Sequence, residues 1–162
     1  MTNKPKYLTE HFAPNDATDS QAAERNNLNN EPPDQLTWDV ISAVAVKMEK
    51  VRALLGNFPV NVSSWYRSPA VNVAVGSKSL NSQHLVGEAV DFTCHKFGDP
   101  VLVVKTLAAN KELIGFDQLI LEHSWVHISF AILTRKPRGQ VLSLLSTGGY
   151  AQGITDKSGK PL

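Results

Sequence analysis

Residues 34–55 form the longest periodic stretch of the chain, and this stretch most limits the folds that the chain can adopt. Its apolar residues recur every three or four positions, as on one face of an α-helix. They are Leu36, Val40, Val44, Met48, Val51 and Leu55. Pro32 and Pro33 favour a helix start just before this stretch, and Gly56 can end the helix in a left-handed conformation. The pattern predicts one long helix that buries an apolar face.

Short apolar stretches follow this helix, and the last of them are not separated by helices. We expect strands at 59–67, 88–93, 118–122, 125–130 and 140–145. A second helix is expected to begin at Asp99-Pro100, where an N-cap residue is followed by proline. The predicted fold class is α+β, with a small antiparallel sheet packed against helices.

The length and composition of the chain suit one globular domain. With 162 residues it can bury a sizeable core, and we expect a single domain over 1–147. Within it, 1–33 is expected as a peripheral N-terminal segment, and 148–162 as a polar C-terminal tail.

Charge, cysteine content and hydropathy exclude several other classes of protein. Cys94 is the only cysteine, which excludes an internal disulfide and a multi-cysteine metal site. A formal net charge of +1 gives no electrostatic reason to expect a nucleic-acid partner. No apolar run is long enough to insert stably into a membrane. A monomer is expected.

Residues 82–91 concentrate the side chains that carry chemistry. The sequence before them is rich in Ser, Gly, Asn and Lys, which is typical of a loop, and it leads to His84. After the turn-forming Gly87, alternation places Asp91 on one face of a strand and its neighbour Val90 on the other. A histidine and an aspartate are therefore expected close together, with the aspartate directed away from the core.

Glu122 and His127 belong to a predicted hairpin with a two-residue turn at His123-Ser124. Glu122 would face Trp125 across this turn, and the two side chains would project from the same surface. His127 lies two residues beyond Trp125 and would therefore be a diagonal neighbour of Glu122, at roughly 7–8 Å between backbone positions.

Two histidines and one carboxylate are enough protein ligands for a catalytic zinc, whose fourth position takes water or substrate. We therefore expect His84, Asp91 and His127 to bind one zinc ion per chain. Glu122 is the expected general base, which takes a proton from water and returns one to the leaving amine. Arg67, at the end of an earlier strand, can stabilise the oxyanion or hold a substrate carboxylate with its forked donors.

Four further residues are expected at the edges of this site. Ser82 and Gln83 are candidate donors that fix the orientation of the ligands. Tyr66, just before Arg67, is a candidate substrate contact. Trp125 either shapes the wall of the substrate site or packs as a buried aromatic side chain.

The ordered motifs of the chain resemble those of one family of peptidases. The motifs are Trp65-Tyr66-Arg67-Ser68, Ser82-x-His84-x-x-Gly87-x-Ala89-x-Asp91 and Glu122…Trp125-Val126-His127. Together they resemble the zinc D-Ala-D-Ala carboxypeptidase-like peptidases, whose fold is shared with the hedgehog signalling domain. The resemblance covers about residues 7–130, and residues 7–12 resemble the phage-associated branch.

This resemblance implies a function for the whole set of candidate residues. It implies a peptidase that cleaves peptidoglycan stem peptides or cross-links, as an endopeptidase or a D,D-carboxypeptidase. His84, Asp91 and His127 would be the zinc ligands, Glu122 the catalytic base and Arg67 a contact to the substrate or transition state.

The first residues lack the apolar run of a signal peptide, which bears on where the protein acts. We expect a phage lysis enzyme, an endolysin, that stays in the host cytoplasm until it is released to the cell wall, or one that the virion carries. The alternative is a catalytically weak zinc-binding virion structural or wall-binding protein, which the presence of Glu122 disfavours.

Overall fold

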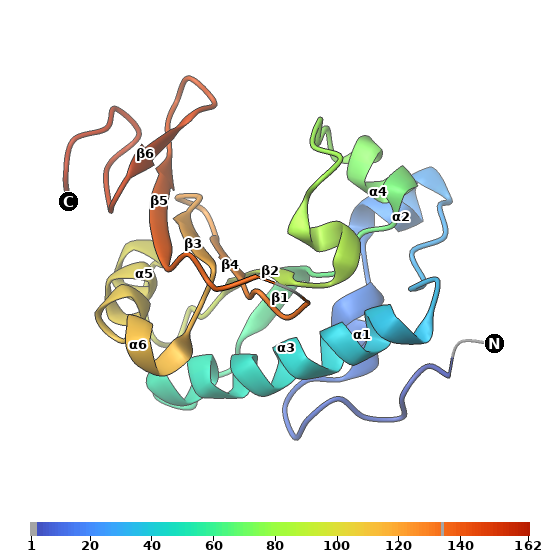
Figure 1. Ribbon diagram of the computed structural model, residues 1–162. Coiled ribbons are helices and arrows are strands. Elements are labelled where there is room, and N and C mark those ends of the chain that lie inside the picture. Colours follow the sequence, from blue (N-terminus) through green and yellow to red (C-terminus); the bar gives the residue numbers. More distant parts are fainter. Residues whose placement is uncertain (1–2, 134) are drawn as a thin grey trace.

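A six-stranded sheet forms the centre of the computed structural model, which describes residues 3–133 and 135–162 (Figure 1). Its strands lie in the order β1-β2-β4-β3-β5-β6. Their bounds are β1 Asn61–Ser64, β2 Ala89–Thr93, β3 Gln118–Leu121, β4 Val126–Ser129, β5 Gln140–Leu144 and β6 Tyr150–Gln152. The helices are α1 Pro14–Thr18, α2 Gln21–Asn26, α3 Gln35–Leu54, α4 Pro69–Ala74, the 3₁₀ helix η1 Gln83–Val86, α5 Pro100–Ala109 and α6 Lys111–Ile114. The predicted α+β class, a sheet packed against helices, is confirmed.

One strand pairing departs from the antiparallel prediction. β5 lies parallel to β3, with Gln140 beside Gln118, whereas the other neighbouring pairs are antiparallel. The reason is that β4 ends at Ser129 beside Gln118, the first residue of β3. The chain then enters β5 from this same end of the sheet, so β5 runs in the direction of β3.

The predicted long helix is present as α3, which runs along one face of the sheet (Figure 1). Asp34 caps it, because its carboxylate accepts a 2.8 Å hydrogen bond from the backbone N–H of Thr37. The predicted apolar face is buried from Val40 onward, together with Trp38 and Ile41. Leu36 is an exception with 60% exposure, although Thr37 and Trp38 of the same first turn are buried.

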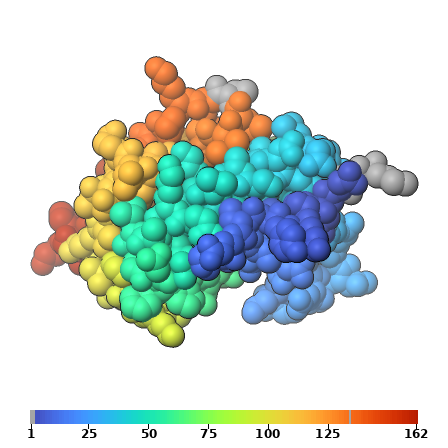
Figure 2. All heavy atoms as spheres, turned by 90° about the horizontal axis from the view of Figure 1, so that it is seen from below, coloured from blue at the N-terminus to red at the C-terminus, as the bar shows by residue number. Residues whose placement is uncertain are grey.

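The N-terminal segment packs against α3 and extends the core. Figure 2 shows its first residues, in dark blue, lying against α3, in cyan to teal. The backbone N–H of His11 donates to the carboxylate of Glu49 on α3 at 2.9 Å. Phe12 is 2% exposed, and its ring meets that of Trp65 edge to face at 6.2 Å. The segment is peripheral in sequence, but its aromatic side chain belongs to the core.

Residues 148–162, expected as a polar tail, add the edge strand β6 to the sheet. β6 pairs antiparallel with β5, with Tyr150 opposite Leu144. The buried hydroxyl of Ser143 accepts a 2.9 Å hydrogen bond from the backbone N–H of Thr155, which fixes the chain after β6. Within the described part of the chain, none of the helices combines the length and apolar character needed to cross a membrane.

Gly87 joins η1 to β2 at a point where a side chain would collide with α3. Its φ is +80°, and an added Cβ would lie 2.7 Å from Cγ1 of Ile41. Gly76 has a similar φ of +82°, but nothing lies within 4 Å of its added Cβ. Alanine at Gly76 would therefore cost only the unfavourable backbone conformation, whereas alanine at Gly87 would add the cost of overpacking against Ile41.

We expect Gly76→Ala to lower the free energy of unfolding by about 1–2 kcal/mol, the cost of a left-handed L-residue. Gly87→Ala should lose a further ~1–3 kcal/mol, because Ile41 must shift. Urea denaturation of both variants measures the difference. Equal losses would contradict the close approach of Gly87 to Ile41.

Candidate metal centre

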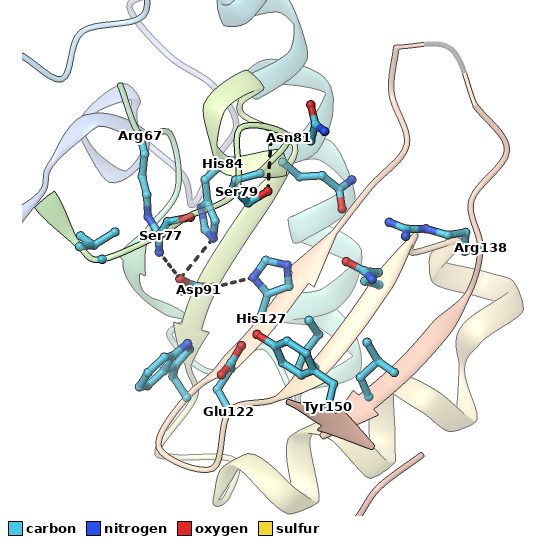
Figure 3. Close-up of a pocket in the computed structure, with 18 of the residues that line it drawn as sticks. Arg67, Ser77, Ser79, Asn81, His84, Asp91, Glu122, His127, Arg138 and Tyr150 are labelled. Carbon is cyan, nitrogen blue, oxygen red and sulfur yellow. Dashed lines mark hydrogen bonds and ion pairs between the residues drawn. The ribbon is translucent and has the colours of Figure 1, made fainter. Parts of the chain in front are cut away.

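Three side chains from three elements meet at one point above the sheet (Figure 3). His84 lies in η1, Asp91 in β2 and His127 in β4, and one ligand atom of each lies within 4.8 Å of the others. Asp91 and His127 are cross-strand partners, so the pairing of β2 with β4 alone brings them together. Oδ1 of Asp91 is 2.9 Å from Nδ1 of His127, and Oδ2 is 3.3 Å from Nε2 of His84. The structure thus assembles the three predicted ligands.

The orientation of His84 is fixed by the segment that leaves β1. Its Nδ1 lies 2.6 Å from the carbonyl oxygen of Trp65, an acceptor, so Nδ1 carries the proton and donates. The backbone N–H of Arg67 donates to the carbonyl oxygen of His84 at 3.0 Å. Burial lowers the pKa of His84, although the carboxylate of Asp91 opposes this shift. The neutral ring therefore presents the lone pair of Nε2 to Asp91.

Two acceptors thus face each other across 3.3 Å, since Nε2 of His84 carries no proton and Oδ2 of Asp91 is a carboxylate oxygen. A cation between them would turn this repulsion into attraction. Two imidazole nitrogens and one carboxylate are a ligand set that divalent zinc accepts, with one position left for water or substrate. The donor set and its spacing therefore fit a metal ion.

Asp91 is the most buried charge of the site and contacts Arg67 as well as the histidines. Burial opposes its ionisation, yet the pKa of its carboxyl lies well below its usual range, and the 2.9 Å hydrogen bond from His127 is among the causes. Nη2 of Arg67 lies 2.8 Å from Oδ2 of Asp91. Nε of Arg67 also donates to the hydroxyl of Ser64, at 2.9 Å. Arg67 is thus held against a ligand carboxylate at the edge of the site.

Glu122 stands at the end of β3, where the predicted hairpin is present. Its backbone N–H donates to the carbonyl oxygen of Trp125 at 3.1 Å, and the residues between them form the turn. Nε2 of His123 lies 2.7 Å from the carbonyl oxygen of Leu144, which ties the turn to β5. Burial raises the pKa of Glu122, with the charge of Asp91 acting in the same direction. Its carboxyl therefore protonates more readily than an ordinary glutamate.

The residues predicted at the edges of the site have different environments. Ser82, Gln83 and Trp125 line the same groove as the ligands. Gln83 donates to the carboxylate of Glu88 at 3.2 Å rather than to a ligand. Trp125 is 38% exposed, so it forms a wall of the groove instead of packing in the core. Tyr66 is not one of the described residues that line the groove. Its side chain is 3% exposed and packs in the core.

The groove has a volume of about 900 Å³ and extends along the open face of β3. Gln118, Ile120 and Glu122 alternate on this face, which strand parity in the sequence could have indicated. The groove is also lined by residues that follow β4, which no short sequence pattern marks. They are Arg135, Arg138, Leu142 and Tyr150.

Tyr150 reaches the groove from the edge strand β6 and faces the candidate base (Figure 3). Partial burial and the charges of Glu122 and Asp91 raise the pKa of the Tyr150 phenol. The hydroxyl is therefore protonated at neutral pH and can donate to the Glu122 carboxylate.

Comparison with known protein families identifies one match. The sequence model of the family described as Peptidase M15 matches residues 10–129 of the chain. The matched residues include the three candidate ligands, Glu122 and Arg67, but end before β5 and β6. No curated protein matches the chain.

Two buried carboxylates fix the chain that follows β4. Asp117 is fully buried and accepts hydrogen bonds from the side chain of Arg138, the shorter at 2.6 Å, and from Arg135 at 3.2 Å. Glu88 accepts from the backbone N–H of Ile132 at 2.9 Å and from the side chain of Arg135 at 3.2 Å. Burial opposes ionisation of Asp117, but Arg138 and Arg135 lower its pKa to about 2. Both carboxylates are therefore compensated charges.

Asp117 should make unfolding sensitive to acid. Its pKa is about 2 in the folded protein against an ordinary 3.8, so its contribution to stability is complete above pH 4 or so and is lost as the pH falls through about 2. The contribution is on the order of 2 kcal/mol. We expect Asp117→Asn to remove that part of the pH dependence in denaturant titrations at several pH values. Asp39→Asn, an exposed control, should follow the wild type; a parallel curve for Asp117→Asn would contradict the pairing.

Proposed function

The chain belongs to the peptidase M15 family, and we propose that it is a zinc-dependent peptidase that cleaves peptidoglycan stem peptides or cross-links. One observation carries the proposal: His84, Asp91 and His127 converge in the same groove that Glu122 lines. A metal site without turnover would not need a buried carboxyl with a raised pKa beside it.

The residues of the chain divide the chemistry among them. His84, Asp91 and His127 would hold zinc, which when bound polarises the scissile carbonyl and lowers the pKa of water. Glu122 takes a proton from the attacking water and returns one to the leaving amine, a transfer that its raised pKa favours. Tyr150 lines the groove with Glu122, and its protonated hydroxyl can donate to the Glu122 carboxylate. The groove holds the peptide in an extended conformation along β3.

Arg67 has a separate part in this mechanism. Its guanidinium is held by Asp91 and Ser64, so it stays in place while the substrate binds. From this position it stabilises the negative charge that develops on the carbonyl oxygen during attack. A flexible lysine could not keep this fork geometry.

We further propose that the enzyme acts as a monomeric phage endolysin, in the host cytoplasm until its release to the cell wall, or from the virion. The sequence of residues 7–12, which resembles the phage-associated branch, supports this. Purified protein added to isolated cell walls should release soluble peptides. A protein that binds walls without releasing peptides would instead be the virion structural or wall-binding alternative.

Glu122→Gln tests the role of the base. We expect this variant to bind zinc with unchanged stoichiometry, because Glu122 is not a ligand, while kcat falls by roughly 10²–10⁴-fold. Mass spectrometry of digested peptidoglycan fragments measures product and identifies the bond that is cut. Full activity of the variant would remove Glu122 from the mechanism. The peptidase proposal fails if zinc-loaded wild type releases no product from any stem peptide.

Asp91→Asn tests the metal site independently of activity. The substitution keeps the shape of the side chain but removes its charge, so zinc affinity should fall by more than about ten-fold. Isothermal titration with zinc measures the affinity, and Asp39→Asn is the matched control at an exposed position of α3. Unchanged zinc affinity in Asp91→Asn would exclude Asp91 as a ligand.

A further inference from the structure

Two arginines that follow β4 line the groove on the side away from the hairpin turn. We propose that Arg135 and Arg138 form a subsite that binds a carboxylate of the bound peptide, two to four residues from the bond that is cleaved. The peptide nature of the ligand rests on the proposed function. The subsite itself does not depend on the metal, so binding and cleavage can be tested separately.

Arg135 and Arg138 lie in the same groove as the candidate ligands but far from them along β3. Figure 3 shows Arg138 across the groove from Asp91, with its guanidinium directed toward the open space. The side chains of Arg135 and Arg138 are 46% and 49% exposed. They are therefore accessible to a ligand that lies on the groove floor.

Buried carboxylates hold the two guanidinium groups on the side away from the groove. Nε and Nη2 of Arg138 donate to the fully buried Asp117, and Nη2 of Arg135 donates to Asp117 and Glu88. Among the described residues, Nη1 of Arg138 and both Nε and Nη1 of Arg135 have no protein acceptor. These N–H groups remain for a ligand, and a fixed guanidinium fork suits the two oxygens of a carboxylate.

The four charges cancel in number, but they are not placed symmetrically. Asp117 and Glu88 are 0% and 2% exposed, whereas both arginines reach the surface of the groove. The positive ends therefore face the ligand, and the negative ends face the protein interior. An anion in the groove therefore lies closer to the N–H donors than to the buried carboxylates. Because the donors are half-buried, salt weakens this attraction only in part.

The spacing along β3 sets the distance between this subsite and the cleaved bond. The arginine end of the groove lies at Gln118, which follows the Asp117 that binds Arg138. The candidate ligand His127 is the cross-strand partner of Ile120, and the candidate base Glu122 lies two residues beyond Ile120. Two to four strand residues at about 3.4 Å each separate these points, roughly 7–14 Å. An extended peptide covers this distance with two to four of its own residues. A terminal carboxylate one residue from the cleaved bond would not reach the arginines.

The floor between the two points suits a peptide backbone with a small apolar side chain. Ile120 and Leu142, adjacent residues of the parallel pair β3 and β5, line it, and Gln118 follows with its amide nitrogen donating to Gln140. The apolar pair offers a carboxylate no hydrogen-bond donor, whereas the arginines do. This favours one position for the acidic group over others.

The test uses stem-peptide fragments that are identical except for one free carboxylate or its carboxamide, moved along the peptide. Binding to the zinc-loaded Glu122→Gln variant is measured by calorimetry at low and high salt. We expect the free carboxylate to bind about ten-fold tighter at one position, two to four residues from the bond cut by wild type, with a smaller advantage at high salt. Equal affinities of the two forms at every position would overturn the subsite, as would no binding of any fragment.

Variants then assign the preference to the arginines. Arg135→Gln and Arg138→Gln, each made in the Glu122→Gln background, should lose most of the ten-fold preference, whereas Arg25→Gln, on the remote α2, should keep it. Because Arg138→Gln leaves Asp117 buried without its main partner, the double variant Asp117→Asn/Arg138→Gln is the second test. A preference that persists in the folded arginine variants overturns the proposal. A preference without any cleavage by wild type would leave the subsite intact and remove the peptidase function.

Discussion

The buried carboxylate of Asp91 is the interaction on which the rest of the site depends. A charge removed from water is tolerated only when other groups compensate it, and here His127 in β4 and Arg67 after β1 both donate to the carboxylate. The neutral ring of His84, in η1, faces the same carboxylate with the lone pair of Nε2. A cation between Nε2 of His84 and Oδ2 of Asp91 would add the remaining compensation.

The opposite face of β2 gives Asp91 its direction. Val90 and Phe92 are fully buried in the core against α3, so the strand cannot rotate without exposing them. Glu88, just before β2, binds Gln83 beside His84 and the backbone of Ile132 after β4. One short segment therefore anchors the core, orients the central ligand and fastens the chain on both sides of it. The position of Asp91 in the candidate metal centre follows from β2 being the inner strand between β1 and β4.

Local periodicity explains which parts of this arrangement could be predicted from the sequence. The face of α3, the two faces of β2 and the turn after Glu122 follow from spacing within one element or one hairpin. The parallel pairing of β5 with β3 depends on residues far apart in sequence, and no short pattern encodes it. β6 is a short, polar edge strand without an apolar period, so Tyr150 could not be placed in the groove. Tyr66 was predicted at the site because it precedes Arg67 in the sequence, but its side chain is buried in the core.

The groove combines two segments of the chain that differ in what they contribute. The segment that matches the peptidase family carries the candidate ligands, Glu122 and Arg67, whose positions are set by buried charge and by strand pairing. The segment after β4 carries Arg135, Arg138 and Tyr150, which are partly exposed and shape the opposite wall. β5 and β6 lie beyond β3, so they take no part in the pairing of β2 with β4 that brings Asp91 and His127 together. We therefore expect substitutions of the exposed side chains of β5 and β6 to change which peptide the groove accepts, while the candidate ligands keep their places.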